Sequence, residues 1–185
     1  MIHSSPQRTA IMLALCGAIF SAMLFASAPG VWLDVPFIKQ EKDGCGAATI
    51  AMVMQYWLKQ QGRTADSAAD AAAIQRELFS AKDHGIRAAD MERYFQQHKF
   101  QTFAFAGKWD DFQQHLEKGR PLIVALKPSN LESSLHYVVV VGVDPAEDVV
   151  LLNDAAQRKL LKEDRSTFAK QWSAVKNWTL LAVPK

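Results

Sequence analysis

Apolar side chains recur at three- and four-residue steps through the first half of the chain. This spacing is typical of helices that bury one face. The clearest case starts at Cys45, ends at Gly62 and has as its apolar positions Ile50, Val53, Met54 and Trp57. The same spacing predicts three further helices, over Ser67–Phe79, Ala88–His98 and Trp109–Lys118.

After Pro121 the pattern changes to short, continuous apolar runs, which predict strands. Leu135–Val143 is so rich in valine that we expect both of its faces to be covered. Asp144–Asp148 has the composition of a turn, so this strand and Val149–Leu152 are predicted to form a hairpin. The other predicted strands are Phe100–Ala106, Leu122–Leu126 and Trp178–Val183. Helices followed by mostly antiparallel strands indicate an α+β fold.

The N-terminal segment has a different character. Residues 10–28 carry no charge and are mostly apolar, and Ala26–Ala28 has the small-x-small pattern of a cleavage site. This order predicts a secretory signal peptide over residues 1–28. An uncleaved membrane anchor is the alternative, because the apolar stretch approaches the length of a membrane span and Pro29 disfavours cleavage. Residues 29–185 then form a single domain, periplasmic or extracellular, or tethered to the membrane by residues 10–28.

Composition and charge exclude some classes of function. The 185 residues are 49% hydrophobic and 22% charged, with a formal net charge of only +2. There is no basic excess for nucleic acid and no block of like charges. We therefore expect a globular protein whose partner is not a nucleic acid, with membrane contact only through an uncleaved N-terminal segment.

Cys45 is the first candidate for chemistry. The chain has two cysteines, and Cys16 lies in the predicted signal, so the exported domain keeps one thiol. An unpaired thiol in an oxidising compartment indicates reactivity. Cys45 stands at the predicted N-terminus of a helix, where the helix dipole favours a thiolate. We expect Gly44 and Gly46 to let a substrate backbone approach. The alternative is a small buried hydrophobic residue, as most free cysteines are.

A nucleophilic cysteine needs a base and a group that orients the base. Among five histidines, His136 alone opens an apolar strand. The length of the following turn decides its partner across the hairpin. A five-residue turn makes Asp154 its diagonal neighbour and a three-residue turn places Asp154 directly opposite, whereas a four-residue turn places Asn153 there. Either residue type can orient an imidazole. Gln40, five residues before Cys45, offers an amide N–H for an oxyanion.

These segments together resemble a known family. Gln40, Asp43–Met52, His136–Val140 and Asn153–Ala156 are similar, in the same order, to motifs of the bacteriocin-processing peptidases, cysteine peptidase family 39. Those are papain-like enzymes that cut after a double-glycine leader. The resemblance covers nearly all of Val35–Val183. It implies a papain-like fold whose helical N-terminal half carries the nucleophile at a helix N-terminus, packed on a sheet that carries the histidine and the aspartate.

The resemblance also implies roles. Cys45 would be the nucleophile, His136 the general base, Asp154 the orienting acid and Gln40 the oxyanion donor, with a thioester intermediate and no metal or organic cofactor. Leader-cutting members are usually fused to a transporter, but this sequence has no multi-span region and no Walker-type phosphate-binding loop. We therefore expect a stand-alone, exported relative, whose substrate does not follow from the double-glycine rule.

Three functions remain open on the sequence. The first is an exported cysteine peptidase that acts on a peptide or protein. The second is an acyl or amide transferase with the same Cys45, His136 and Asp154, since a thioester reacts with amines as well as with water. The third is a non-catalytic peptide-binding module, because a fold does not determine a function. Retention of all the groups that the chemistry needs favours the peptidase.

Overall fold

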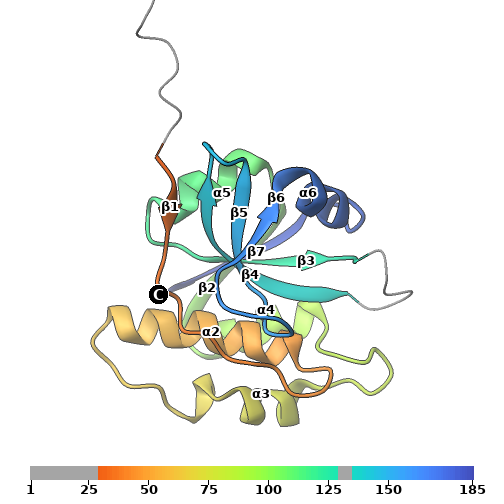
Figure 1. Ribbon diagram of the computed structural model, residues 1–185. Coiled ribbons are helices and arrows are strands. Elements are labelled where there is room, and N and C mark those ends of the chain that lie inside the picture. The colour runs from red at the N-terminus through yellow and green to blue at the C-terminus, as the bar shows by residue number, and fades with distance from the viewer. Residues whose placement is uncertain (1–28, 129–134) are drawn as a thin grey trace, which may run out of the picture.

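The computed structural model describes residues 29–128 and 135–185, and this part of the chain has an α+β fold (Figure 1). Its seven strands form one antiparallel sheet in the order β2-β7-β3-β4-β5-β6, with β1 paired to β4. The helices are α2 (Cys45–Gln60), the short 3-10 helix η1 (Ser67–Ala69), α3 (Ala71–Leu78), α4 (Ala88–Gln97), α5 (Trp109–Leu116) and α6 (Arg165–Ser173). The strands are β1 (Val31–Trp32), β2 (Phe100–Ala106), β3 (Leu122–Leu126), β4 (His136–Asp144), β5 (Val149–Asn153), β6 (Leu161–Asp164) and β7 (Trp178–Pro184).

Helices lie on both sides of the sheet (Figure 1). On one side are α2, α3 and α4, whose buried side chains pack with Tyr137 and Val139 of β4. On the other side are α5 and α6, whose buried aromatic rings pack with Val138 and Val140. Successive side chains of a strand point to opposite faces. The valine-rich strand β4 is therefore covered on both faces, which confirms the prediction from its composition.

Helix α2 is anchored along its length. Its C-terminal half is tied to other elements by two side chains: Tyr56 Oη donates to Gly119 O at 2.9 Å, and Trp57 Nε1 donates to Ala182 O at 3.0 Å. Near its N-terminus, Thr49 Oγ1 donates to Gly46 O at 2.9 Å. The bonds of Tyr56 and Trp57 hold the helix in place, whereas the Thr49 bond lies within the helix. The first residue of α2, Cys45, is thereby placed beside the start of β4.

One expectation from the sequence is wrong in detail, and three elements were not predicted. Ser67–Phe79 is not one helix, because Asp70 has an extended backbone between η1 and α3 and its carboxylate accepts from Ala73 N at 2.8 Å, capping α3. An aspartate that caps a new helix ends the previous one. The strands β1 and β6 and the helix α6 were not predicted; β6 and α6 supply the outer edge of the sheet and one wall of its far face.

The predicted signal peptide or anchor, residues 1–28, lies outside the described residues. Within residues 29–128 and 135–185, no helix has the length and apolar character needed to cross a membrane.

Candidate active site

His136 and Asp154 are joined by a hydrogen bond of 2.8 Å between Nε2 and Oδ1. His136 is the first residue of β4, and Asp154 directly follows β5. Both side chains are shielded, with 14% of the His136 side chain and 5% of the Asp154 side chain exposed. Asp154 also accepts from Ala156 N at 2.9 Å and from Gln157 Nε2 at 2.8 Å. The carboxylate is thus held by donors at both of its oxygens.

A β-bulge explains why the imidazole meets Asp154 and not Asn153. Asp144 pairs with Val149, so four residues form the turn, a length that by itself would have placed Asn153 on the face of His136. The register then shifts between Val140 and Gly142, which inserts one residue into β4 and restores the original parity. Asn153 is instead buried in the protein, where Nδ2 donates to Val35 O at 3.1 Å and Oδ1 accepts from Leu160 N at 3.1 Å.

Cys45 completes the constellation. It is the first residue of α2, is partly buried, and is the one free cysteine among the described residues. It lies close enough to His136 for its charge to raise the pKa of that imidazole. The pKa of the neighbouring Tyr137 is raised to about 12, mainly by burial and to a smaller extent by the charge of Cys45. The structure therefore brings the three residues singled out in the sequence, Cys45, His136 and Asp154, to one place.

The electrostatics of the site favour a charged imidazole. Burial by itself lowers the pKa of His136, but the hydrogen bonds to Asp154 and Cys45 and the charges of both groups outweigh it and raise the pKa to about 9. Burial pushes the pKa of Asp154 up, and the hydrogen bond and charge of His136 more than offset this, so that the pKa lies below its ordinary value. At neutral pH the site therefore holds an imidazolium next to an ionised carboxylate.

Gln40 is attached to the same region by its backbone. Its N–H donates to Ala155 O at 3.0 Å, next to Asp154, and its side chain lines a pocket of about 430 Å³ together with Gly44, the N-cap of α2. The Gln40 Oε1 is buried and has no hydrogen-bond partner among the described residues. The residues that line this pocket do not include Cys45, His136 or Asp154.

The glycines beside Cys45 have a different role from the expected one. Both are buried: a Cβ at Gly46 would lie 2.9 Å from the Ile86 Cβ, and a Cβ at Gly44 would lie 3.0 Å from Glu41 O. Real Cβ atoms do not approach neighbours as closely as the first of these distances. The expectation that they make room for a substrate backbone is wrong, because the protein itself fills this space. Gly46 instead lets the α3–α4 loop close against the first turn of α2.

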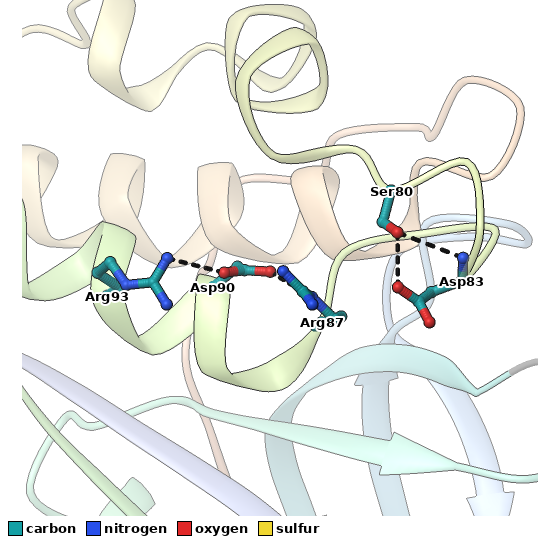
Figure 2. A network of polar contacts seen from close by, with 5 residues as sticks. All are labelled: Ser80, Asp83, Arg87, Asp90 and Arg93. Carbon is teal, nitrogen blue, oxygen red and sulfur yellow. Dashed lines mark hydrogen bonds and ion pairs between the residues drawn. The ribbon is translucent and has the colours of Figure 1, made fainter.

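That loop, which borders the first turn of α2, is fixed by a polar network (Figure 2). Ser80 Oγ donates to Asp83 Oδ2 at 2.5 Å. Asp90, at the start of α4, pairs with both Arg87 at 2.7 Å and Arg93 at 2.9 Å, and the hydrogen bond from Arg87 is the main reason that the pKa of Asp90 is lowered.

Within the described part of the chain, no cluster of three or more histidine, cysteine or acidic side chains has the arrangement to hold a metal ion.

Sequence reasoning missed three residues of this region. Gln157 holds Asp154, and Glu163 of β6 and Gln171 of α6 line a pocket beside His136 and Asp154. Gln157 lies only three residues beyond Asp154, so its position was a usable signal. Glu163 and Gln171 belong to two elements that were not predicted, and nothing in their sequence spacing connects them with His136.

The fold is that of the papain-like cysteine peptidases of the C39 type. The family model described as "Peptidase_C39 like family" matches residues 32–179, and the chain belongs to this family. A search of curated proteins found no match.

Solved structures agree with this assignment. A C39-like peptidase from Bacillus anthracis is similar with a TM-score of 0.64 at 17% identity, over 85% of this chain and 99% of that chain. A double glycine motif protease from an AMS/PCAT transporter, in complex with the leader peptide, is similar with a TM-score of 0.64 at 19% identity, over 86% of this chain and 100% of that chain. The peptidase domain of Streptococcus ComA is similar with a TM-score of 0.60 at 19% identity, over 80% of this chain and 98% of that chain. At such identities the likeness concerns the fold.

Proposed function

We propose that this chain is a cysteine peptidase that hydrolyses a peptide bond in an exported peptide or protein through a thioester intermediate. The observation that carries the proposal is the 2.8 Å hydrogen bond between His136 and Asp154, with Cys45 close enough to raise the pKa of the same imidazole. Nucleophile, base and orienting group in this order are the arrangement used for acyl transfer. Membership of the peptidase family supports the reaction class.

In the proposed first half-reaction, the Cys45 thiolate attacks the scissile carbonyl carbon and an S–C bond forms. The carbonyl oxygen becomes an oxyanion, to which the Gln40 Nε2 and the free N–H groups at the N-terminus of α2 donate. When the tetrahedral species collapses, the C–N bond breaks and His136 gives its proton to the leaving amine. The result is an acyl thioester on Cys45, a neutral imidazole and a released amine.

In the second half-reaction, His136 takes a proton from water, and the resulting hydroxide attacks the thioester carbon. The C–S bond then breaks, the carboxylic acid product leaves, and the thiolate–imidazolium pair is restored. Asp154 keeps the imidazole in one orientation and stabilises its charge throughout, because its two oxygens are occupied by His136, Ala156 and Gln157.

The test is the reactivity of Cys45 in the purified full chain. A Cys16→Ser background leaves Cys45 as the sole thiol. Alkylation by iodoacetamide is measured from about pH 5 to pH 9 in this background, with added His136→Ala, and with His84→Ala, an exposed loop histidine, as the matched control. Rapid alkylation at about pH 6 that His136→Ala abolishes and His84→Ala retains is expected. Equal, slow alkylation in all three would favour the non-catalytic binding module.

We also propose that residues 1–28 export the domain, as a cleaved signal or as an anchor. The uncharged stretch from Ala10 to Ala28 and the small residues at its end support this. Fractionation of cells that express the full chain, combined with mass spectrometry of the mature N-terminus, tests it. Chain recovered from the cytoplasm with residues 1–28 intact would contradict export.

A further inference from the structure

A pocket of about 340 Å³ lies beside the candidate active site. His136 and Asp154 form part of its lining. Leu126 and Leu161 provide apolar surface, and Glu163 is the acidic side chain contributed by the neighbouring strand β6. The volume is at the small end of ligand pockets, which span roughly 300–1,000 Å³. It suits one extended side chain and not a folded partner.

Glu163 is a half-buried carboxylate that pairs with no cationic side chain in the part of the chain that the structure describes. Its Oε1 accepts from Gln171 Nε2 at 2.7 Å, and no partner of Oε2 occurs among the described residues. The pKa of Glu163 lies above the ordinary value for a glutamate. Burial is the main cause, and the charge of Asp154 is the second. A carboxylate in this environment gains when a positive group comes close, because the group compensates both the lost hydration and the repulsion.

The other charges that line the pocket are already paired. Asp154 is occupied by His136, Ala156 and Gln157. Lys162 forms an ion pair with Glu147. The positive charge of His136 lies between Cys45 and Asp154. Glu163 is therefore the uncompensated charge of the pocket, as far as the described part of the chain shows.

Proton transfer determines which half of a substrate passes this pocket. His136 has to reach the nitrogen that leaves, so the residues that follow the scissile bond run along the His136 side of the site. We propose that the pocket is a specificity site for a lysine or arginine side chain on the leaving-group side of the substrate, recognised by Glu163. Its assignment as a substrate subsite rests on the proposed peptidase function. The apolar wall holds the aliphatic stem and Glu163 holds the cationic end.

The first test uses the thiol itself and needs no known substrate. Cys45, in the Cys16→Ser background, is treated with three symmetrical disulfides: bis(2-ammonioethyl) disulfide, bis(2-sulfonatoethyl) disulfide and the neutral bis(2-hydroxyethyl) disulfide. Each forms a mixed disulfide with Cys45, and the S–S bond that breaks releases the other half of the reagent, with its charge, as a thiol on the leaving-group side. The rate for the cationic reagent, divided by the rate for the neutral reagent, isolates the effect of charge. We expect Glu163→Gln to lower this ratio by about threefold or more, as for removal of a partly buried ion pair.

Asp164→Asn is the matched control, because Asp164 is the next residue of β6 and is exposed outside the pocket lining. It removes the same charge one residue away. An unchanged ratio in Glu163→Gln, or an equal fall in Asp164→Asn, would overturn the proposal, since the preference would then come from no local site. A thiol that reacts with none of the reagents would refute the peptidase function instead.

A second measurement tests whether the pocket binds a cation, even if the thiol reacts with none of the reagents. n-Butylammonium is titrated into the 15N-labelled Cys45→Ser variant, and the side-chain amide signals of Gln171, the hydrogen-bond partner of Glu163, are followed. A saturable shift with n-butylammonium, absent with n-butanol and lost in Glu163→Gln, is expected. The absence of a shift, or the same shift in Glu163→Gln, contradicts a cation site.

Discussion

Gln157 donates from Nε2 to Oδ2 of Asp154 at 2.8 Å, which is the carboxylate oxygen that His136 does not use. The backbone N–H of Ala156 shares Oδ1 with the imidazole, at 2.9 Å. With donors at both oxygens, the plane of the carboxylate is defined, and the imidazole that it binds is defined with it. The residue that orients His136 is therefore itself oriented, by a side chain of the loop between β5 and β6.

Gln157→Met is predicted to slow alkylation of Cys45 about tenfold at neutral pH, because the substitution keeps the size of the side chain and removes a hydrogen bond to a charged group. The fall in rate on the acidic side of the pH profile should move to higher pH, since Gln157 is one of the donors that lower the pKa of Asp154. Gln113→Met, the same change at an exposed bond on α5, is the control and should leave the profile unchanged.

Asp154→Asn is predicted to lower the pKa of His136 from about 9. The hydrogen bond to Asp154 is the largest cause that raises this pKa, and the opposing effect of burial stays in the variant. A hydrogen bond to a charged group contributes about 1.5–3 kcal/mol, which corresponds to a fall of about one to two pH units. NMR titration of the imidazole carbon-bound protons in both proteins measures it. An unchanged midpoint would show that Asp154 does not control the charge of His136.

The stability of the fold should fall as the pH rises through the titration of His136. The pKa is raised from 6.5 to about 9, so the folded chain holds the proton more tightly than the unfolded chain. The contribution of the imidazole is complete below about pH 6.5 and is lost as the pH rises through 9. A thiolate at Cys45 contributes with the opposite sign over the same range, so the measurement is made in a Cys45→Ser background. The opposite effect of Asp154, whose pKa is lowered, occurs only below its ordinary value of 3.8 and lies outside this window.

Urea unfolding at about pH 6 and about pH 9.5 measures this difference. His136→Gln should remove most of it, because the variant has no imidazole to titrate. If the chain with His136 is as stable, relative to the His136→Gln variant, at the higher pH as at the lower one, the raised pKa is contradicted. Comparing the two proteins at each pH cancels the contributions of those titrating groups that do not interact with His136.

The sequence predicted most of the helices and strands. The spacing of apolar residues identified α2, α4 and α5 and the strands β2, β3, β4, β5 and β7, of which α2 and β4 are largely buried, whereas α5 buries only Phe112 and Leu116 and β2 only Phe100. Helix α6 buries only Phe168 and Trp172, and β6 has no buried residue. Because α5 also buries only two residues and was identified, the degree of burial does not by itself explain why α6 was missed.

The site was predicted as a set of residues but not as a geometry. Cys45, His136 and Asp154 were named, and the choice between Asn153 and Asp154 depended on a turn length that was not known. The structure has a four-residue turn and a bulge at Val141, and the two deviations together restore the register expected for a five-residue turn. A run of valines carries no sign of a bulge, but Gly142 does, because its Cβ would lie 2.8 Å from Leu151, Trp32 and Val31.

Gly46→Ala provides a test of the contact between the α3–α4 loop and the nucleophile helix. The added methyl group would lie 2.9 Å from the Ile86 Cβ, so the loop or the first turn of α2 has to move. Overpacking of this kind costs about 1–3 kcal/mol. Replacing glycine by alanine in a helix gains about 1 kcal/mol, so over most of that range the cost exceeds the gain. We therefore expect a lower free energy of unfolding and slower alkylation of Cys45.

Two further variants separate this steric contact from other effects of the substitution. Gly85→Ala is the matched control, since its Cβ would meet nothing closer than Asp83 O at 4.0 Å, and it should leave stability and reactivity unchanged. Ile86→Gly combined with Gly46→Ala removes the clashing Cβ of residue 86 and should recover part of the alkylation rate lost in Gly46→Ala alone. If the double variant reacts as slowly as the single one, the close approach of Ile86 is not what makes glycine necessary beside Cys45.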